Sequence, residues 1–277
     1  MTNGTRLFIR LGATLCALSL RVPAASINNG GFESGFAGWT RADQVGSDGT
    51  FALQTGAASP VNGTAVPAPP EGSTAAMSDA QGPGSHVLYQ TFMATALVPQ
   101  TVLDFDLFIG NRASAFFTPS NLNFAMPTLN QQARVDILMG GADPFSVSPA
   151  DVLMSLFQTT TVDPLVSGYT HHTSDITALL NSHLDTPLTL RFAETDNVFA
   201  FQFGVDNVDI QETAVPETSS TWLLAGALSI IALIRRRPGW IHSVETFCSR
   251  ANIPVLERQH GNQEDVFGFD AKSEDDR

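Results

Sequence analysis

Short apolar runs separated by turn residues constrain the fold of this chain more than any other feature. Runs of about 4–8 residues rich in Val, Ile and Phe are typical of β-strands, and Gly, Pro, Asn and Ser between them are typical of turns. Helix signals are scarce, and only residues 174–180 predict a short capped helix. The sequence therefore predicts an all-β fold, an antiparallel β-sandwich. The runs occupy residues 102–109, 134–139, 152–158, 188–192, 198–203 and 205–210.

Two long segments interrupt this pattern. Residues 56–85 are dominated by Ala, Gly, Pro and Ser, and residues 111–133 are rich in Asn and Phe. Irregular segments of this length are uncommon in compact domains and are often functional or disordered. We expect both to be loops, and Phe116 and Phe117 in the second to need burial or a partner.

Cysteine usage and charge narrow the classes of function. Residues 26–213 contain no cysteine, which excludes a disulfide framework and a cysteine metal site there. The same residues hold 18 Asp and Glu against four Arg and no Lys, a net charge of −14. Such a surface repels nucleic acid and anionic lipid, so neither is an expected partner. Clustered carboxylates could bind Ca²⁺, and the alternative is that the acidity only maintains solubility.

The N-terminus has the composition of an export signal. Arg6 and Arg10 precede an apolar stretch at residues 11–20, and residues 22–25 end in two alanines. This order is typical of a cleaved secretory signal peptide. We therefore expect a signal peptide at residues 1–25 and a domain that acts outside the cytoplasm.

The C-terminal region contains a polar box, a short apolar run at residues 221–234 and a basic stop. A helix over that run reaches about 21 Å, whereas a bilayer core is about 30 Å thick. Basic residues stay on the cytoplasmic side. The sequence predicts a short hydrophobic helix that anchors the protein transiently, and an ordinary membrane anchor is the alternative. The box and the stop consist of Val215, Pro216, Glu217, Arg235, Arg236 and Arg237.

This order of features resembles the PEP-CTERM sorting tail of Gram-negative bacteria that produce exopolysaccharide. The resemblance assigns residues 214–237 to sorting and implies a membrane-embedded, exosortase-like protease as partner. It also implies passage through the inner membrane to the outer surface or the extracellular matrix. Thr218 departs from the pattern, because a second proline is common there. Residues 238–277 form an acidic, polar extension that such tails normally lack, and we expect it to be disordered.

The two ends of residues 26–213 carry a second resemblance. Residues 28–39 contain the order N-G-G-F-E followed by G-W, and residues 205–208 read V-D-N-V. These motifs resemble the first and last strands of galactose-binding-like jelly rolls found in carbohydrate-binding modules. The resemblance implies a jelly-roll ectodomain in which Trp39 packs into the core. It also implies a structural Ca²⁺ site at Glu33 and Asp206, and the alternative is that both are exposed acids at strand ends.

Catalytic motifs are weak in this chain. There is no nucleophile elbow, phosphate-binding loop or dinucleotide fingerprint, so we expect a protein that is not an enzyme. Asp104 and Asp106 share one face of a predicted strand and could serve glycoside hydrolysis. His171 and His172 near Asp175 are metal-capable types, but adjacent residues of a strand point to opposite faces.

The leading hypothesis is an exported, surface-sorted protein without enzymatic activity. Its jelly-roll domain would associate with exopolysaccharide or biofilm matrix. A structural or adhesive surface protein that binds no sugar is the main alternative. A glycan-active hydrolase and an ice-binding protein are further alternatives, and residues 159–161, all Thr, are the only hint of the latter.

Overall fold

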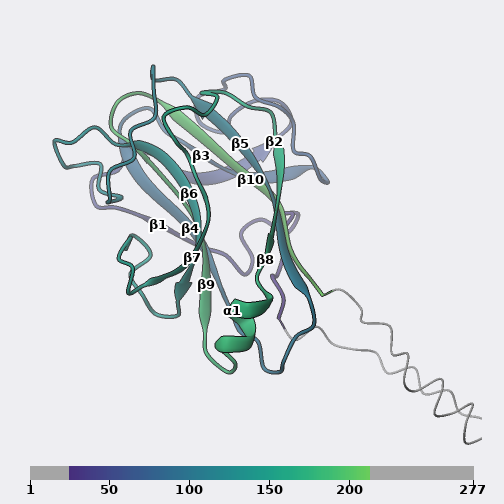
Figure 1. Cartoon of the computed structure of the whole chain (residues 1–277). Coiled ribbons are helices and arrows are strands. Elements are labelled where there is room, and N and C mark those ends of the chain that lie inside the picture. Colours follow the sequence, from purple (N-terminus) through teal and green to yellow (C-terminus); the bar gives the residue numbers. More distant parts are fainter. Residues whose placement is uncertain (1–24, 213–277) are drawn as a thin grey trace, which may run out of the picture. The chain divides into compact units, whose positions relative to one another are not determined.

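The computed structural model describes residues 25–212, which form two antiparallel sheets packed face to face (Figure 1). Apart from Ala25, the predicted signal peptide lies outside the described residues, as do the sorting segment at 214–237 and the extension at 238–277. No helix within the described residues is long and apolar enough to cross a membrane. The predicted antiparallel jelly-roll sandwich is confirmed.

Each sheet contains five strands within the described residues, and neighbouring strands pair antiparallel. The first sheet has the order β1 (Thr40–Asp43), β4 (Gly84–Phe92), β9 (Leu188–Asp196), β6 (Gln131–Met139) and β7 (Val152–Gln158). The second has the order β2 (Thr50–Thr55), β3 (Thr74–Asp79), β10 (Phe201–Glu212), β5 (Thr101–Asn111) and β8 (Thr170–Asp175). The short helix α1 (Thr177–Ser182) follows β8, close to the predicted position.

Strand β10 keeps one apolar face across a bulge. Its register against β5 shifts between Asp206 and Asp209, and Asn207 there has a φ of 51°. An extra residue reverses the alternation of a strand, so apolar side chains on both sides of the bulge point into the core. The two runs predicted as separate strands are therefore one strand. Its core-facing residues are Phe201, Phe203, Val205, Val208 and Ile210.

The opening segment packs against this last strand. Trp39 is buried, with its ring centroid 5.3 Å from that of Phe32 and 5.9 Å from that of Phe192. The expectation that Trp39 belongs to the core is confirmed. A Cβ atom at Gly30 would lie 1.8 Å from the backbone oxygen of Val208, so only glycine fits where the two ends of the domain meet.

Several strands escape the sequence pattern because they are polar or built from small residues. The segment expected to be irregular at 56–85 contains β3 and the start of β4. Ala75 and Ala76 in β3 are fully buried, but small residues give little hydrophobic signal. In the second long segment, Phe116 is fully buried, in line with the expectation that its ring needs burial or a partner.

A buried ion pair joins β6 to β9. The Asp136 carboxylate accepts hydrogen bonds from Nε (2.7 Å) and Nη2 (2.8 Å) of Arg134, and from Nη2 of Arg191. Arg191 is fully buried, and its Nη1 also donates to the backbone oxygen of Pro144 at 2.7 Å. Burial lowers the pKa of Arg191, and the charge of Asp136 opposes that shift. One carboxylate thus compensates two guanidinium groups inside the fold.

We expect Asp136→Asn to lower the free energy of unfolding by about 3–5 kcal/mol, because it leaves a buried arginine without its counter-charge. Asp209→Asn, on the exposed side of β10, is the control and should change it by less than about 0.5 kcal/mol. Denaturant unfolding of both variants provides the measurement. Equal stability of the two variants would contradict the assignment.

Candidate functional site

The candidate site lies where two connections pass from one sheet to the other. The β3–β4 connection (residues 80–83) and the β9–β10 connection (residues 197–200) both make this crossing. They lie side by side, since Gly84 pairs with Asp196. We call the depression along them the Phe199 groove.

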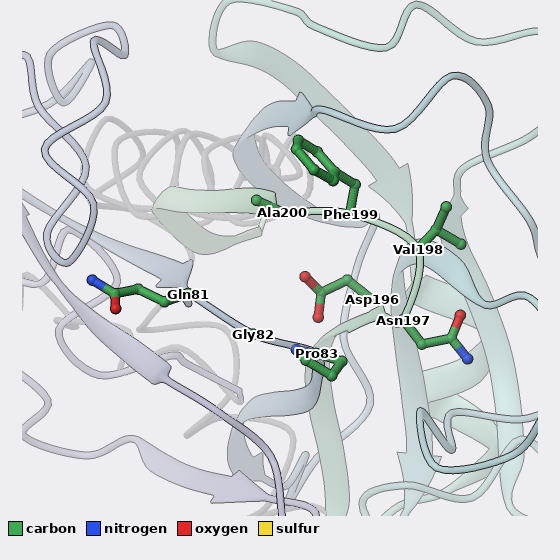
Figure 2. Close-up of a pocket in the computed structure, with 8 residues that line it drawn as sticks. All are labelled: Gln81, Gly82, Pro83, Asp196, Asn197, Val198, Phe199 and Ala200. Carbon is green, nitrogen blue, oxygen red and sulfur yellow. The ribbon is translucent and has the colours of Figure 1, made fainter.

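The Phe199 groove consists of two adjoining hollows. The first, shown in Figure 2, has a volume of about 280 Å³ and is lined by residues 81–83 and 196–200. The second has a volume of about 370 Å³, and its further lining residues are Asn62, Thr64, Ala80, Arg112 and Gln202. Gln81, Phe199 and Ala200 line both hollows, so the groove is continuous around the Phe199 side chain.

Phe199 is 63% exposed, although it sits on a tightly held turn. The Gln131 side chain accepts hydrogen bonds from the backbone N–H groups of Val198 and Phe199, both at 3.3 Å. Its Nε2 donates to the backbone oxygen of Phe199 at 2.7 Å. The ring is thus displayed to solvent by a backbone whose polar groups are already satisfied.

Asn197 fixes the same turn to the long loop that precedes β6. Its backbone N–H donates to the Asn130 oxygen at 2.9 Å, and its Oδ1 accepts from the Asn130 N–H at 2.7 Å. Its Nδ2 lies within hydrogen-bond distance of the backbone oxygens of Phe124 (3.1 Å), Met126 (3.3 Å) and Thr128 (2.9 Å). The second long irregular segment, residues 111–133, thus supports the turn that carries Phe199.

Amide side chains line the second hollow and surround a buried carboxylate. Nδ2 of Asn62 donates to Oδ1 of Asp79 at 2.6 Å, and Nε2 of Gln202 donates to the same oxygen at 3.0 Å. Burial raises the pKa of Asp79, but hydrogen bonds from these neighbours outweigh it and hold that pKa below its usual range. Oε1 of Gln202 is buried and has no hydrogen-bond partner among the described residues. Gln202 is only 1% exposed, so this unpaired acceptor is enclosed by the protein.

Asp196 forms part of the floor of the first hollow. Burial raises its pKa to about 7, against the opposing effects of a hydrogen bond from the Gly84 N–H (2.8 Å) and of His86. Figure 2 shows its carboxyl group directed toward the segment of Gln81 and Gly82. Near neutral pH this group exchanges between a hydrogen-bond donor and an acceptor.

Glu33, one of the two predicted calcium ligands, is engaged by the protein itself. Its carboxylate accepts hydrogen bonds from the backbone N–H groups of Ser73 (2.7 Å) and Thr74 (2.8 Å) and from both hydroxyl groups (2.8 and 2.9 Å). These bonds, led by that from the Ser73 backbone, lower the pKa of Glu33 to about 2. Four protein donors thus already contact the Glu33 carboxylate, three of them at Oε1.

Asp206 in β10, the other predicted ligand, contacts the segment that also binds Glu33, residues 71–74. Its Oδ2 accepts from the Glu71 N–H at 3.2 Å, and its Oδ1 accepts from the Asn207 N–H at 2.8 Å. Burial raises its pKa to about 7, and the charges of Glu71 and Asp106 add to the shift. The structure thus brings both Glu33 and Asp206 to one segment, residues 71–74. The calcium site stays a prediction.

Asp104, Asp106 and His171, which the sequence singled out, lie on adjacent strands β5 and β8 of the second sheet. Nδ1 of His171 lies 2.9 Å from Oδ1 of Asp106, and the Thr173 hydroxyl donates to Asp104. The His172 ring instead stacks on Phe105 with centroids 5.4 Å apart, so the two histidines point to opposite faces as expected. Among residues 25–212, no three His, Cys, Asp or Glu side chains are grouped to hold a metal ion.

Sequence patterns did not identify the Phe199 groove. They place Phe199 within a strand at 198–203, whereas residues 197–200 form a connection and β10 begins at Phe201. The turn-forming pair Asp196 and Asn197 was the available signal, because such residues favour a chain reversal. The sorting residues Val215, Pro216, Glu217, Arg235, Arg236 and Arg237 lie outside the described residues.

No family model and no curated protein matches this chain. Solved structures similar to it include a carbohydrate-binding module of the β-sandwich superfamily, at 18% identity and a TM-score of 0.38. That match covers 65% of this chain, which spans 60% of the length of that module. An adhesin domain of Lys-gingipain from Porphyromonas gingivalis is 14% identical with a TM-score of 0.41, covering 67% of this chain and 98% of that one. At these values the likeness concerns the fold only.

The expectation that the protein is not an enzyme was wrong as an inference from its fold and motifs. A Stig cyclase from Fischerella sp. TAU is also similar, at 19% identity and a TM-score of 0.39, with 68% of this chain and 97% of that one covered. Further cyclase structures from Fischerella match in the same way. Sandwiches similar to this one thus include enzymes as well as binding modules, and missing sequence motifs do not exclude catalysis.

Removal of divalent cations tests the calcium prediction. Because protein donors already satisfy Glu33, we expect excess chelator to leave the Tm of the full-length chain unchanged. Glu33→Gln should lower the Tm with and without chelator, since it weakens the hydrogen bonds to residues 73 and 74. A Tm that falls with chelator and recovers with Ca²⁺ would contradict this expectation and support the calcium site.

Proposed function

We propose that this domain binds glycans in the Phe199 groove, on a protein exported to the cell surface. The observation that carries the proposal is the exposed Phe199 ring on a turn held by Gln131 and Asn197. The apolar C–H face of a pyranose ring stacks on an aromatic ring, and a fixed ring loses little conformational entropy on binding. Phe199 is thus already in the conformation in which it would contact a sugar.

The polar groups around Phe199 match the hydroxyl groups of a sugar. Gln81 and Phe199 both line the two hollows, and Gln202 lines the second one. Asp196 and Asn62 add a carboxyl group and an amide. A few placed polar groups around an apolar surface are the usual composition of a ligand site.

The cellular setting of the proposal rests on the ends of the sequence. The signal-peptide pattern and the resemblance to a sorting tail support export, transient anchoring in the inner membrane and processing by an exosortase-like protease. On this proposal the glycan is exopolysaccharide of the surrounding matrix. The acidity of residues 26–213 suits solubility outside the cell.

Acid–base catalysis on a bound glycan is the second candidate function. The observation that favours it is Asp196, a buried carboxyl group with a pKa of about 7 on the floor of the groove. A group whose pKa lies near the operating pH can both donate and accept a proton. Release of reducing ends from bound polysaccharide would identify this activity, and intact polysaccharide after prolonged incubation would exclude it.

We expect Phe199→Ala to weaken binding of exopolysaccharide from the producing cells by at least about 10-fold, because a central aromatic anchor is lost. Leu97→Ala is a matched control, since Leu97 is 73% exposed and follows the far end of β4. It should leave affinity unchanged. Affinity electrophoresis of the full-length chain measures both, and equal binding by both variants would contradict the proposal.

A further inference from the structure

We infer that the Phe199 groove selects glycans that carry an isolated carboxylate, such as one uronate residue in an otherwise neutral chain, and that Arg112 binds this carboxylate. The inference rests on the proposed function. It names the chemical class of the ligand and the residue that distinguishes it from a neutral glycan.

Arg112 differs from the other three arginines of the described residues because its guanidinium group has no bonding partner there. Arg134 and Arg191 pair with Asp136 inside the sandwich. Nη1 of Arg41 donates to the backbone oxygen of Phe51 at 2.8 Å, and its guanidinium lies 4.5 Å from the centre of the Phe36 ring. The Arg112 side chain has no ion pair or hydrogen bond within residues 25–212, and it is exposed in the second hollow.

The backbone at Arg112 is nevertheless fixed beside Phe199. Its N–H donates to the backbone oxygen of Ala200 at 3.0 Å. The preceding residue, Asn111, accepts a hydrogen bond from Nε2 of Gln131 at 2.9 Å. That same Gln131 amide holds the Phe199 turn. One buried side chain thus sets the position of both the aromatic ring and the base of the arginine.

The surroundings of Arg112 explain why the ligand charge should be isolated. Residues 26–213 carry a net charge of −14, so a polymer with a charge on every sugar is repelled by most of the surface. A single carboxylate can meet Arg112 in a bidentate, charge-assisted pair while neutral sugars contact Phe199 and the amides. The buried carboxylate of Asp79 already accepts hydrogen bonds from Asn62 and Gln202, two residues that line the second hollow.

The test is calorimetric titration of the full-length chain with two matched ligands. One is an oligosaccharide with a single glucuronate flanked by neutral hexoses, and the other is the same oligosaccharide after reduction of its carboxyl group to the alcohol. We expect the native protein to prefer the acidic form by about 10-fold or more, the size of a charge-assisted bond. Arg112→Gln should bind both forms with the affinity that the native protein has for the reduced form. Arg41→Gln removes the same charge outside the groove and should keep the preference.

The outcomes separate the inference from the function on which it rests. If the native protein binds both forms with equal affinity and Phe199→Ala loses this binding, the inference is overturned. Glycan binding in the groove then still stands. A preference that persists in Arg112→Gln would also overturn it, because another group would then bind the carboxylate. Binding of neither form by the folded protein would overturn the proposed function and the inference together.

Discussion

Phe199 remains exposed because the Gln131 side chain holds the turn that carries it. The amide accepts from two consecutive N–H groups and donates to the Phe199 oxygen and to Asn111. Gln131 is fully buried, so these bonds form away from competing water. A ring of this size would otherwise be expected to fold inward, as Phe201 does two residues later. The position of Arg112, through Asn111, depends on the same amide.

The sandwich supplies the frame for this arrangement. Its apolar core runs along alternate residues of each strand, and the bulge in β10 preserves that core up to the opening segment. Toward the groove the same row of β9 changes from Leu190 and Phe192 to Glu194 and Asp196. Burial raises the pKa of Glu194 well above its ordinary value, and the nearby Asp196 charge adds to this shift. The core thus becomes polar where two connections cross between the sheets, and the proposed glycan-binding groove lies at that polar end.

The sequence was sufficient to predict the sandwich but not its functional groove. Alternating apolar runs identified the long strands, and β7 matches its predicted bounds of 152–158. Short or small-residue strands such as β1 and β3 gave no such signal, because pairing with neighbours stabilises them more than their own composition does. The groove could not be predicted, since Gln81, Arg112 and Phe199 are far apart in the chain and meet only where the crossings coincide. The hydrogen bonds of Glu33 and Asp206 to residues 71–74 could not be predicted either, because that segment carries no recognisable pattern.

The most direct test of this account is to map the bound glycan by NMR. Backbone amide shifts of the full-length chain would be followed during titration with exopolysaccharide fragments from the producing cells. The account predicts that the shifted amides cluster in residues 80–83, 197–202 and around Arg112. Saturable binding with shifts confined to another surface, such as the strand β8, would contradict the claim that the Phe199 groove is the binding site.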